Sequence, residues 1–325
     1  MNQFGRKFRL SIFGESHGEI MGITLDGVPS GIPLDKNDFT KDIERRKPGQ
    51  IGTTPRVESD EVRFASGVFN GFTTGAPLTL LFENANTRSG DYAEFRKFPR
   101  PGHADFVAEK KFKGFQDYRG GGHFSGRLTV LLVAAGVVAK KILGDCSVEA
   151  EIIEVGGERT VELGLQKAID QKDSVGGIIQ CIAKNIPIGY GEPFFDSLES
   201  IISHAVFSVP AVKGIEFGSG FQSAKMFGSE NNDAIINVGG KTATNNAGGI
   251  VGGISNGNDI VFRVAIKPTS STPLEQQTLN LETKTIEKYQ VKGRHDLCIA
   301  LRAPVVIEAV TAITLADAKL LAAVD

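Results

Sequence analysis

Two long segments of the chain are apolar on nearly every helical face. Leu128 to Gly144 is a mostly apolar run with lysines in its last turns and a glycine at its exit, and Pro304 to Val324 begins with a proline and holds few charges. These are start and stop signals of helices. A helix that is apolar all round must be covered on all sides in a globular protein. The pattern therefore predicts two buried central helices.

Much of the remaining chain alternates apolar and polar positions between glycine turns, which is typical of short strands. The expected strands are 8–13, 23–28, several within 52–84, 149–155, 175–183 and 260–266. Helices are expected from an Asp35 N-cap to about Arg46 and near 163–171. With the strand-rich segments outside and the apolar helices inside, we expect one large α+β domain over residues 1–325. Its architecture is a β-α-β sandwich whose central helices lie between antiparallel sheets.

Composition narrows the class of protein. The net charge of -2 offers no general attraction to nucleic acid or to a membrane surface. The three cysteines are widely spaced and form no C-x-x-C pair, so neither a disulfide framework nor a metal site is indicated. The N-terminal segment lacks an apolar signal region, and no uncharged apolar run reaches membrane-spanning length. We expect a cytoplasmic protein with no nucleic-acid or membrane partner.

The segment from Arg100 to Arg127 has the strongest chemical signal. It places His103 and His123 among arginines and contains the glycine run 120–122. Histidine exchanges a proton near neutral pH, arginine binds carboxylate or phosphate, and glycines let a ligand approach the backbone. A glycine-rich hairpin with solvated arginines explains the same residues equally well. The segment alone leaves both interpretations open.

Further candidate residues lie on loops elsewhere. His17 follows a strand in a glycine-flanked turn, Arg46 ends the helix after Asp35, and Lys267 precedes a proline and three hydroxyl residues. Asp296 follows a basic cluster at the start of the C-terminal apolar segment. Each has a structural alternative: a surface histidine, a helix-dipole cation, a polar turn and an ordinary ion pair. His204, among apolar residues, is expected to be a core histidine.

Common nucleotide-binding and metalloprotease motifs are absent: there is no P-loop, no complete G-x-G-x-x-G and no H-E-x-x-H. Instead, segments along nearly the whole chain resemble, in order, those of the chorismate synthase family. The resembling segments are Phe13–Gly18, Asp26–Leu34, Arg45–Gln50, Ser66–Leu78, Arg100–Asp105, Asp117–Gly122, Ser125–Arg127, Asn245–Gly257, Lys267–Ser271 and Gly293–Asp296.

The resemblance implies a lyase of the shikimate pathway, which supplies aromatic amino-acid biosynthesis. The family eliminates phosphate from 5-enolpyruvylshikimate 3-phosphate to give chorismate, a 1,4-anti elimination that needs reduced FMN but has no net redox change. By resemblance, the flavin lies among one set of residues. They are His123, Phe124, Ser125, Pro210, Ala211, Gly252, Lys267, Pro268, Thr269, Ser270, Ser271 and Arg294.

The resemblance also implies individual roles. Arg46, Arg100 and Arg127 are expected to bind the substrate, whose phosphate and two carboxylates suit bidentate guanidinium groups. His17 is expected to protonate the departing phosphate and His103 to support the reduced flavin. Asp296 is expected to work through the flavin N5 in removing the proton from C6.

After Arg46, Ile51-Gly52 stands where a further arginine is common in the family. Two substitutions also depart from the family pattern: His123 replaces an arginine and Leu128 replaces a glutamate. They keep open an alternative class, a non-redox protein that binds a phosphate ligand on the same loops. The compact chain has no segment resembling a flavin reductase, so an external reductase is expected to supply reduced flavin, with NADPH acting only indirectly. A homotetramer is expected by resemblance.

Overall fold

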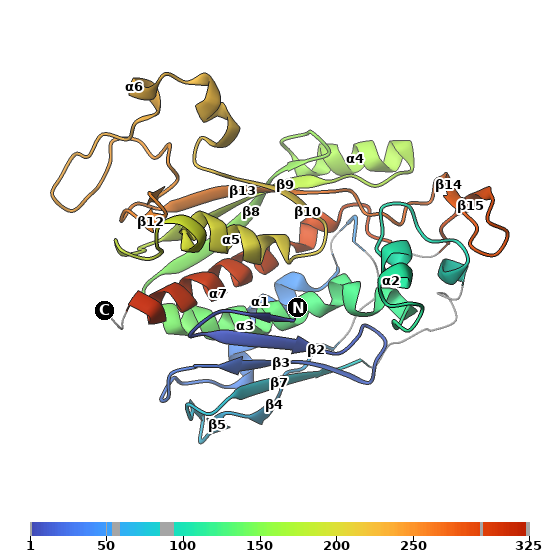
Figure 1. The fold of residues 1–325 in the computed structure, drawn as a ribbon, viewed down its shortest axis with the longest axis horizontal. Coiled ribbons are helices and arrows are strands. Elements are labelled where there is room, and N and C mark those ends of the chain that lie inside the picture. The colour runs from blue at the N-terminus through green and yellow to red at the C-terminus, as the bar shows by residue number, and fades with distance from the viewer. Residues whose placement is uncertain (1, 50, 54–58, 85–93, 293–294, 323–325) are drawn as a thin grey trace.

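The computed structural model describes residues 2–49, 51–53, 59–84, 94–292 and 295–322. Two antiparallel sheets enclose a layer of helices (Figure 1). The five-stranded sheet has the order β1-β2-β3-β7-β4 and the four-stranded sheet the order β10-β13-β9-β8. The strands of the first sheet are β1 Gln3–Phe4, β2 Arg9–Phe13, β3 Ile20–Asp26, β4 Arg63–Ser66 and β7 Leu78–Glu83. Those of the second are β8 Ser147–Val155, β9 Gly177–Lys184, β10 Val212–Phe217 and β13 Ile260–Ile266.

The central layer contains α3 (Thr129–Leu143) and α7 (Pro304–Ala322), with α1 (Thr40–Arg46) beside them. The helix α3 packs on β3, and α7 packs on β8 and β9, so the two helices separate the sheets. They run in the same direction, with their N-terminal ends towards α2 (Asp105–Lys111) (Figure 1). The helix α5 (Leu198–Phe207) packs on α7 and β10, and α4 (Val161–Gln171) packs on β8.

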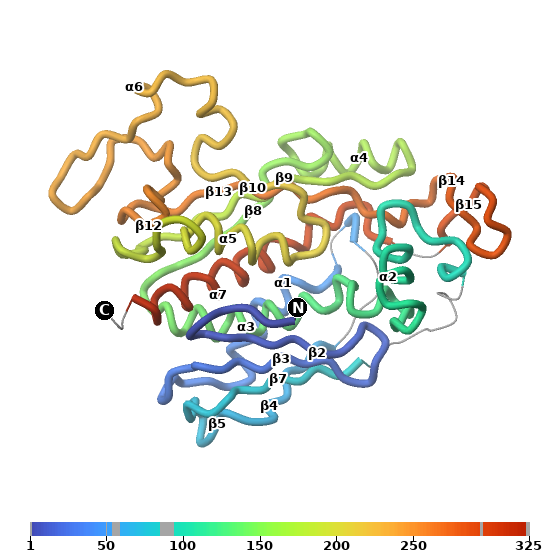
Figure 2. Tube along the Cα trace, viewed as in Figure 1, coloured from blue at the N-terminus to red at the C-terminus, as the bar shows by residue number. Residues whose placement is uncertain are grey.

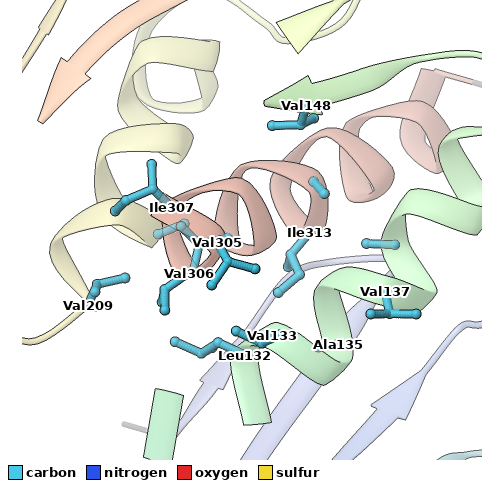
Figure 3. Packing of buried hydrophobic residues seen from close by; sticks show 14 of the residues in the cluster. Leu132, Val133, Ala135, Val137, Val148, Val209, Val305, Val306, Ile307 and Ile313 are labelled. Atoms are coloured by element: carbon cyan, nitrogen blue, oxygen red, sulfur yellow. The ribbon is translucent and has the colours of Figure 1, made fainter. Parts of the chain in front are cut away.

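The contact between α3 and α7 is close because small residues lie where the helices meet. A Cβ atom at Gly136 would lie 2.4 Å from the Cβ and 2.6 Å from the Cα of Ala309. Valine, leucine and isoleucine side chains of both helices pack around this contact and towards Val148 of β8 and Val209 (Figure 3). The buried core is therefore continuous from one sheet through the helices to the other.

Several of the remaining elements lie at the two ends of the molecule (Figure 2). At one end are α2 and the hairpin of β14 (Glu275–Leu279) and β15 (Ile286–Gln290). At the other end are the β11–β12 hairpin and a projecting segment, residues 218–247, which we call the arm. The short elements are β5 Val68–Phe69, β6 Phe72–Thr73, β11 Ile250–Val251, β12 Ile254–Ser255 and α6 Gly228–Asn231.

The expected α+β sandwich and both apolar central helices are confirmed. Asp35 is the predicted N-cap: its carboxylate accepts a hydrogen bond from the backbone N of Asn37 at 2.6 Å, although the first turn is a 3-10 helix, Lys36–Phe39. The expectation for His204 was wrong, because the side chain is exposed on α5 and touches the edge of Phe4. Among the described residues, no helix combines the length and apolar character needed to cross a bilayer.

We predict that Gly136→Val destabilises the fold by about 1–3 kcal/mol, because overpacking forces α3 and α7 apart. The free energy of unfolding in denaturant measures the effect. Gly228→Ala is the control, since an added Cβ there meets no atom within 4 Å. Equal stabilities of the two variants would contradict the role of the Gly136 contact.

Candidate active site

His17 lies beneath the glycine turn that the sequence singled out. Gly120, Gly121 and Gly122 all have positive φ, of 59°, 81° and 54°, which favours glycine. A Cβ at Gly120 would lie 2.1 Å from the Nδ1 of His17, and one at Gly121 would lie 3.5 Å from the Cε1 of His103. The turn thus packs closely against His17 and makes an ordinary van der Waals contact with His103. It brings together residues that are 86 positions apart in the chain.

Arg100, His103 and Asp105 form a compact network at the start of α2. The Arg100 guanidinium donates from Nε and Nη2 to the two carboxylate oxygens of Asp105, both at 2.8 Å, and lies over the ring of Phe95. The Nδ1 of His103 is 2.6 Å from the same carboxylate. Burial opposes ionisation of Asp105, but the hydrogen bonds from Arg100 and His103 prevail and hold its pKa well below the usual range. The carboxylate therefore fixes both the arginine and the imidazole.

The loop after β13 reaches this network. Ser271 Oγ accepts a hydrogen bond from Arg100 Nη1 at 3.1 Å, and Ser270 Oγ donates to the carbonyl of Gly102 at 2.8 Å. The Lys267 backbone N donates to the Ala211 carbonyl at 2.9 Å, so the two loops expected to hold a flavin are neighbours. Burial, together with nearby Lys213, lowers the pKa of Lys267.

A second cluster is built from arginines that are almost fully buried. Arg46 and Arg127, with 5% and 9% of their surface exposed, both pair with the buried carboxylate of Asp60. Burial lowers the pKa of Arg46 to about 10; Asp60 opposes this shift, while Arg127 and Arg302 add to it. Two guanidinium groups thus share one carboxylate, which leaves the cluster with excess positive charge.

Asp296 joins the arginine cluster through Arg302, whose Nη2 lies 2.6 Å from its Oδ2. Arg302 ends the 3-10 helix Ile299–Arg302, directly before α7. The backbone N of Leu297 donates to the Gly52 carbonyl at 2.8 Å, which holds this segment against the chain that follows α1. Asp296 therefore does form an ion pair, as the structural alternative proposed. Its partner in this pair is Arg302, and the pair lies beside the arginine cluster.

Asn84 connects the loop of His17 to the arginine cluster. Its side-chain amide donates to the carbonyls of Glu15 and Gly18, on either side of His17, at 3.2 and 2.8 Å. Its Oδ1 accepts from Arg127 Nε at 3.3 Å. Burial lowers the pKa of His295, and the charge of Arg100 adds to this shift. The structure thus gathers His17, His103, Arg46, Arg100, Arg127 and Asp296 in one region beside the N-terminal ends of α3 and α7.

The other expected residues lie at the edge of this region or outside it. His123 is exposed and turned towards the N-terminal segment, with its Nδ1 2.8 Å from the Gly14 carbonyl. Phe124 is partly exposed against Phe112, and the Ser125 hydroxyl accepts from the Arg127 backbone N. Gly252, in the β11–β12 turn, lies at the opposite end of the molecule (Figure 2). Arg294 lies outside the described residues.

The loop 267–271 fits the phosphate of a cofactor such as FMN. Thr269 Oγ1 is buried with no hydrogen-bond partner in the described part of the chain, and Lys267 lies two residues away. The neighbouring Ala211 has a φ of 74°, an unusual value for a residue with a side chain, and such strain concentrates at functional sites. In the described segments, no group of three or more His, Cys, Asp or Glu could hold a metal ion.

The sequence analysis did not identify three residues of the site: Asp60, Asp105 and Arg302. Asp105 had a readable signal, because it lies two residues after His103 and five after Arg100 at a helix start. Asp60 had none, since its partners lie 14 and 67 positions away. The sequence analysis assigned no role to Arg302, which lies two residues before the C-terminal helix.

Comparisons with known proteins agree with one another. The profile of the chorismate synthase family matches residues 8–320. A chorismate synthase of Chitinophaga pinensis is 65% identical over 99% of this chain and 97% of that protein, and one of Korarchaeum cryptofilum is 45% identical over 97% and 96%. A solved chorismate synthase structure superposes with a TM-score of 0.72 at 27% identity, covering 98% of this chain and 92% of that chain.

Histidines and arginines from distant segments gather beside the buried helical layer, and side chains of this kind suit a small anionic ligand. The profile match and the identities show that the chain belongs to the chorismate synthase family. It is therefore an enzyme, and the alternative class of a non-redox phosphate-binding protein is set aside.

We predict that Asp105→Asn lowers the free energy of unfolding at pH 7 by roughly 1–3 kcal/mol, because it removes a charged partner of Arg100 and His103. The folded-state pKa of Asp105 is depressed, so its contribution is present above its usual pKa and is lost as pH falls below about 4. Denaturant titrations should therefore show the difference narrowing in acid. The control is Glu275→Gln, which breaks an exposed pair with Lys288. A difference that stays constant between pH 7 and pH 3 would be evidence against this account.

Proposed function

We propose that the protein eliminates phosphate from 5-enolpyruvylshikimate 3-phosphate to form chorismate, by 1,4-anti elimination with bound reduced FMN and no net redox change. Family membership supports chorismate as the product. One structural observation supports the location of the active site. Asn84 connects the loop of His17 to Arg127, so the residue proposed as the proton donor is joined to the buried arginine cluster. A substrate with a phosphate and two carboxylates needs such a combination.

In this proposal Arg46, Arg100 and Arg127 bind the anionic groups of the substrate. The first and last are held by Asp60 and are shielded from water, where charge-assisted hydrogen bonds are strong. Arg100 is oriented by Asp105 and Ser271. Since these partners fix the guanidinium groups before the ligand arrives, little reorganisation is required on binding.

His17 protonates the phosphate as the carbon–oxygen bond breaks, because a protonated phosphate is a better leaving group. The close packing of Gly120 fixes the imidazole. Asp296 receives the proton lost from C6, and its pair with Arg302 keeps the carboxylate in place. These two residues therefore act on the two bonds that the elimination breaks.

His103, Lys267 and the hydroxyl residues 269–271 would hold the reduced flavin, together with Pro210 and Ala211. Asp105 orients the imidazole of His103 for that purpose. When bound, reduced FMN supplies electron density during cleavage of the carbon–oxygen bond. A separate reductase, drawing on NADPH, supplies the flavin in its reduced form.

A homotetramer is also part of the proposal, and the arm supports it. The arm exposes several large apolar side chains: Phe221, Phe227, Ile235, Ile236 and Val238. Its shape is held by internal bonds, since Asp233 accepts from the backbone N of Asn246 and of Ala247. An ordered apolar surface of this kind fits against another copy of the chain. Gly252 could then approach a flavin only across such a contact.

We predict that the purified protein forms chorismate when FMN is reduced chemically under anaerobic conditions. With oxidised FMN and NADPH but no reductase, we expect no product. Absorbance of chorismate and release of phosphate measure the reaction, and addition of a flavin reductase should restore turnover. Turnover with NADPH and FMN alone would refute the need for an external reductase.

We also predict that His17→Ala and Asp296→Ala each lower kcat by about a hundredfold or more, the usual contribution of a positioned acid or base. Melting temperatures should show that both variants fold. His204→Ala is the control, because this histidine is exposed on α5, away from the two clusters. Near-normal turnover in either site variant would remove the role assigned to that residue.

A further inference from the structure

The arginine cluster has more hydrogen-bond donors than the protein itself satisfies. Arg46, Arg127 and Arg302 face two carboxylates, Asp60 and Asp296. Three nitrogens remain buried without a hydrogen-bond partner among the described residues: Arg46 Nε, Arg127 Nη2 and Arg302 Nε. A buried charged donor without a partner is unfavourable by more than a typical hydrogen bond contributes. Three such donors in one cluster indicate that a ligand completes it.

Arg302 belongs to this cluster through backbone geometry as well as charge. The segments 51–53 and 297–302 lie side by side, joined by the hydrogen bond from Leu297 to Gly52. The side chain of Leu301 comes within 3.2 Å of a Cβ placed on Gly52. Gly52 lies six residues after Arg46, the last residue of α1. Contacts of Gly52 with the segment 297–302 therefore bring Arg302 near Arg46. The effect of Arg302 on the pKa of Arg46 agrees with this placement.

Arg100 and Arg302 differ in the number of guanidinium donors that remain available for a ligand. All three of its nitrogens have partners within the protein, namely Asp105, His103 and Ser271. Arg302 uses Nη2 on Asp296, while its Nε has none within the described residues. Of these two arginines, Arg302 therefore has the donor that a ligand can use without breaking an existing contact.

We propose that Arg302 is a further substrate-binding residue: its Nε, with Arg46 Nε and Arg127 Nη2, binds one phosphate or carboxylate group of the substrate, while its Nη2 holds Asp296 in position. The identity of that substrate rests on the proposed function. The three guanidinium groups exceed the two carboxylates by one positive charge, which a bound anion neutralises. One side chain thus connects anion binding to the position of the carboxylate that receives the proton.

Binding of inorganic phosphate tests the anion site without flavin or turnover. Isothermal titration should detect phosphate binding to the wild-type protein, and Arg302→Gln should weaken it roughly tenfold or more. The matched control is Arg263→Gln, since Arg263 also pairs through Nη2 with one carboxylate, Glu216, at 3.0 Å. That variant should bind phosphate like the wild type. Because no product is measured, this result is independent of the proposed reaction.

Arg302→Lys separates the two roles. Its single nitrogen can pair with Asp296 but cannot also replace Nε, so phosphate binding should weaken while Asp296 keeps a cation. In steady-state assays we expect this variant to raise KM for the substrate with kcat close to that of the wild type, and Arg302→Gln to lower kcat as well. The same comparison remains decisive if Arg302→Gln does not fold.

Three results would overturn the proposal. The first is a wild-type protein that binds no phosphate. The second is wild-type phosphate affinity and KM in folded Arg302→Lys. The third is an equal loss of affinity in Arg263→Gln, because the effect would then not be specific to the cluster.

Discussion

The close contact between α3 and α7 is the constraint on which the rest of the structure depends. Helices that are apolar on every face need cover on both sides, and the two sheets provide it. Gly136 against Ala309 lets the two helices pack closely, with α3 against β3 of one sheet and α7 against β8 and β9 of the other. Arg127 and Arg302 precede these helices by two residues each, and their positions are therefore fixed by the core.

Buried charge then determines what the site can bind. Asp60 and Asp105 each hold cationic or imidazole groups in fixed directions, and both carboxylates are enclosed. Removing either carboxylate would leave a buried cation unpaired. The fold then loses more stability than if that cation had been replaced by an apolar residue. Selection for a rigid anion site and selection for a stable fold thus act on the same residues. The glycine turn adds a second rigid element, because no other residue fits above His17.

Prediction from sequence succeeded where the signal is local and periodic. The central helices, β13 and the Asp35 cap all follow from neighbouring residues. The helix α2 was missed because it has only seven residues and lies between a Pro-Gly turn and a glycine-rich segment. His204 was misjudged because α5 buries only the face of Leu198, Ile202, Ala205 and Val206. The apolar composition of its sequence hid the exposed face.

The candidate site was predictable in its residue types but not in its pairing. The resemblance gave Arg46, Arg127 and Asp296, whereas Asp60 and Arg302 emerged only once distant segments were placed side by side. Ion pairs between residues 46, 60 and 127 depend on tertiary packing, and no local pattern encodes them. The glycine run was expected to let a ligand approach the backbone, whereas the structure shows that His17 packs against Gly120.

The shared direction of α3 and α7 has an electrostatic consequence. Aligned peptide dipoles give each helix a partial positive charge at its first turn, and these turns directly follow Arg127 and Arg302 of the arginine cluster. This potential comes from the backbone and carries no titratable group. Attraction for an anion would therefore persist over the whole pH range in which the fold survives, even where histidines and carboxylates change their charge.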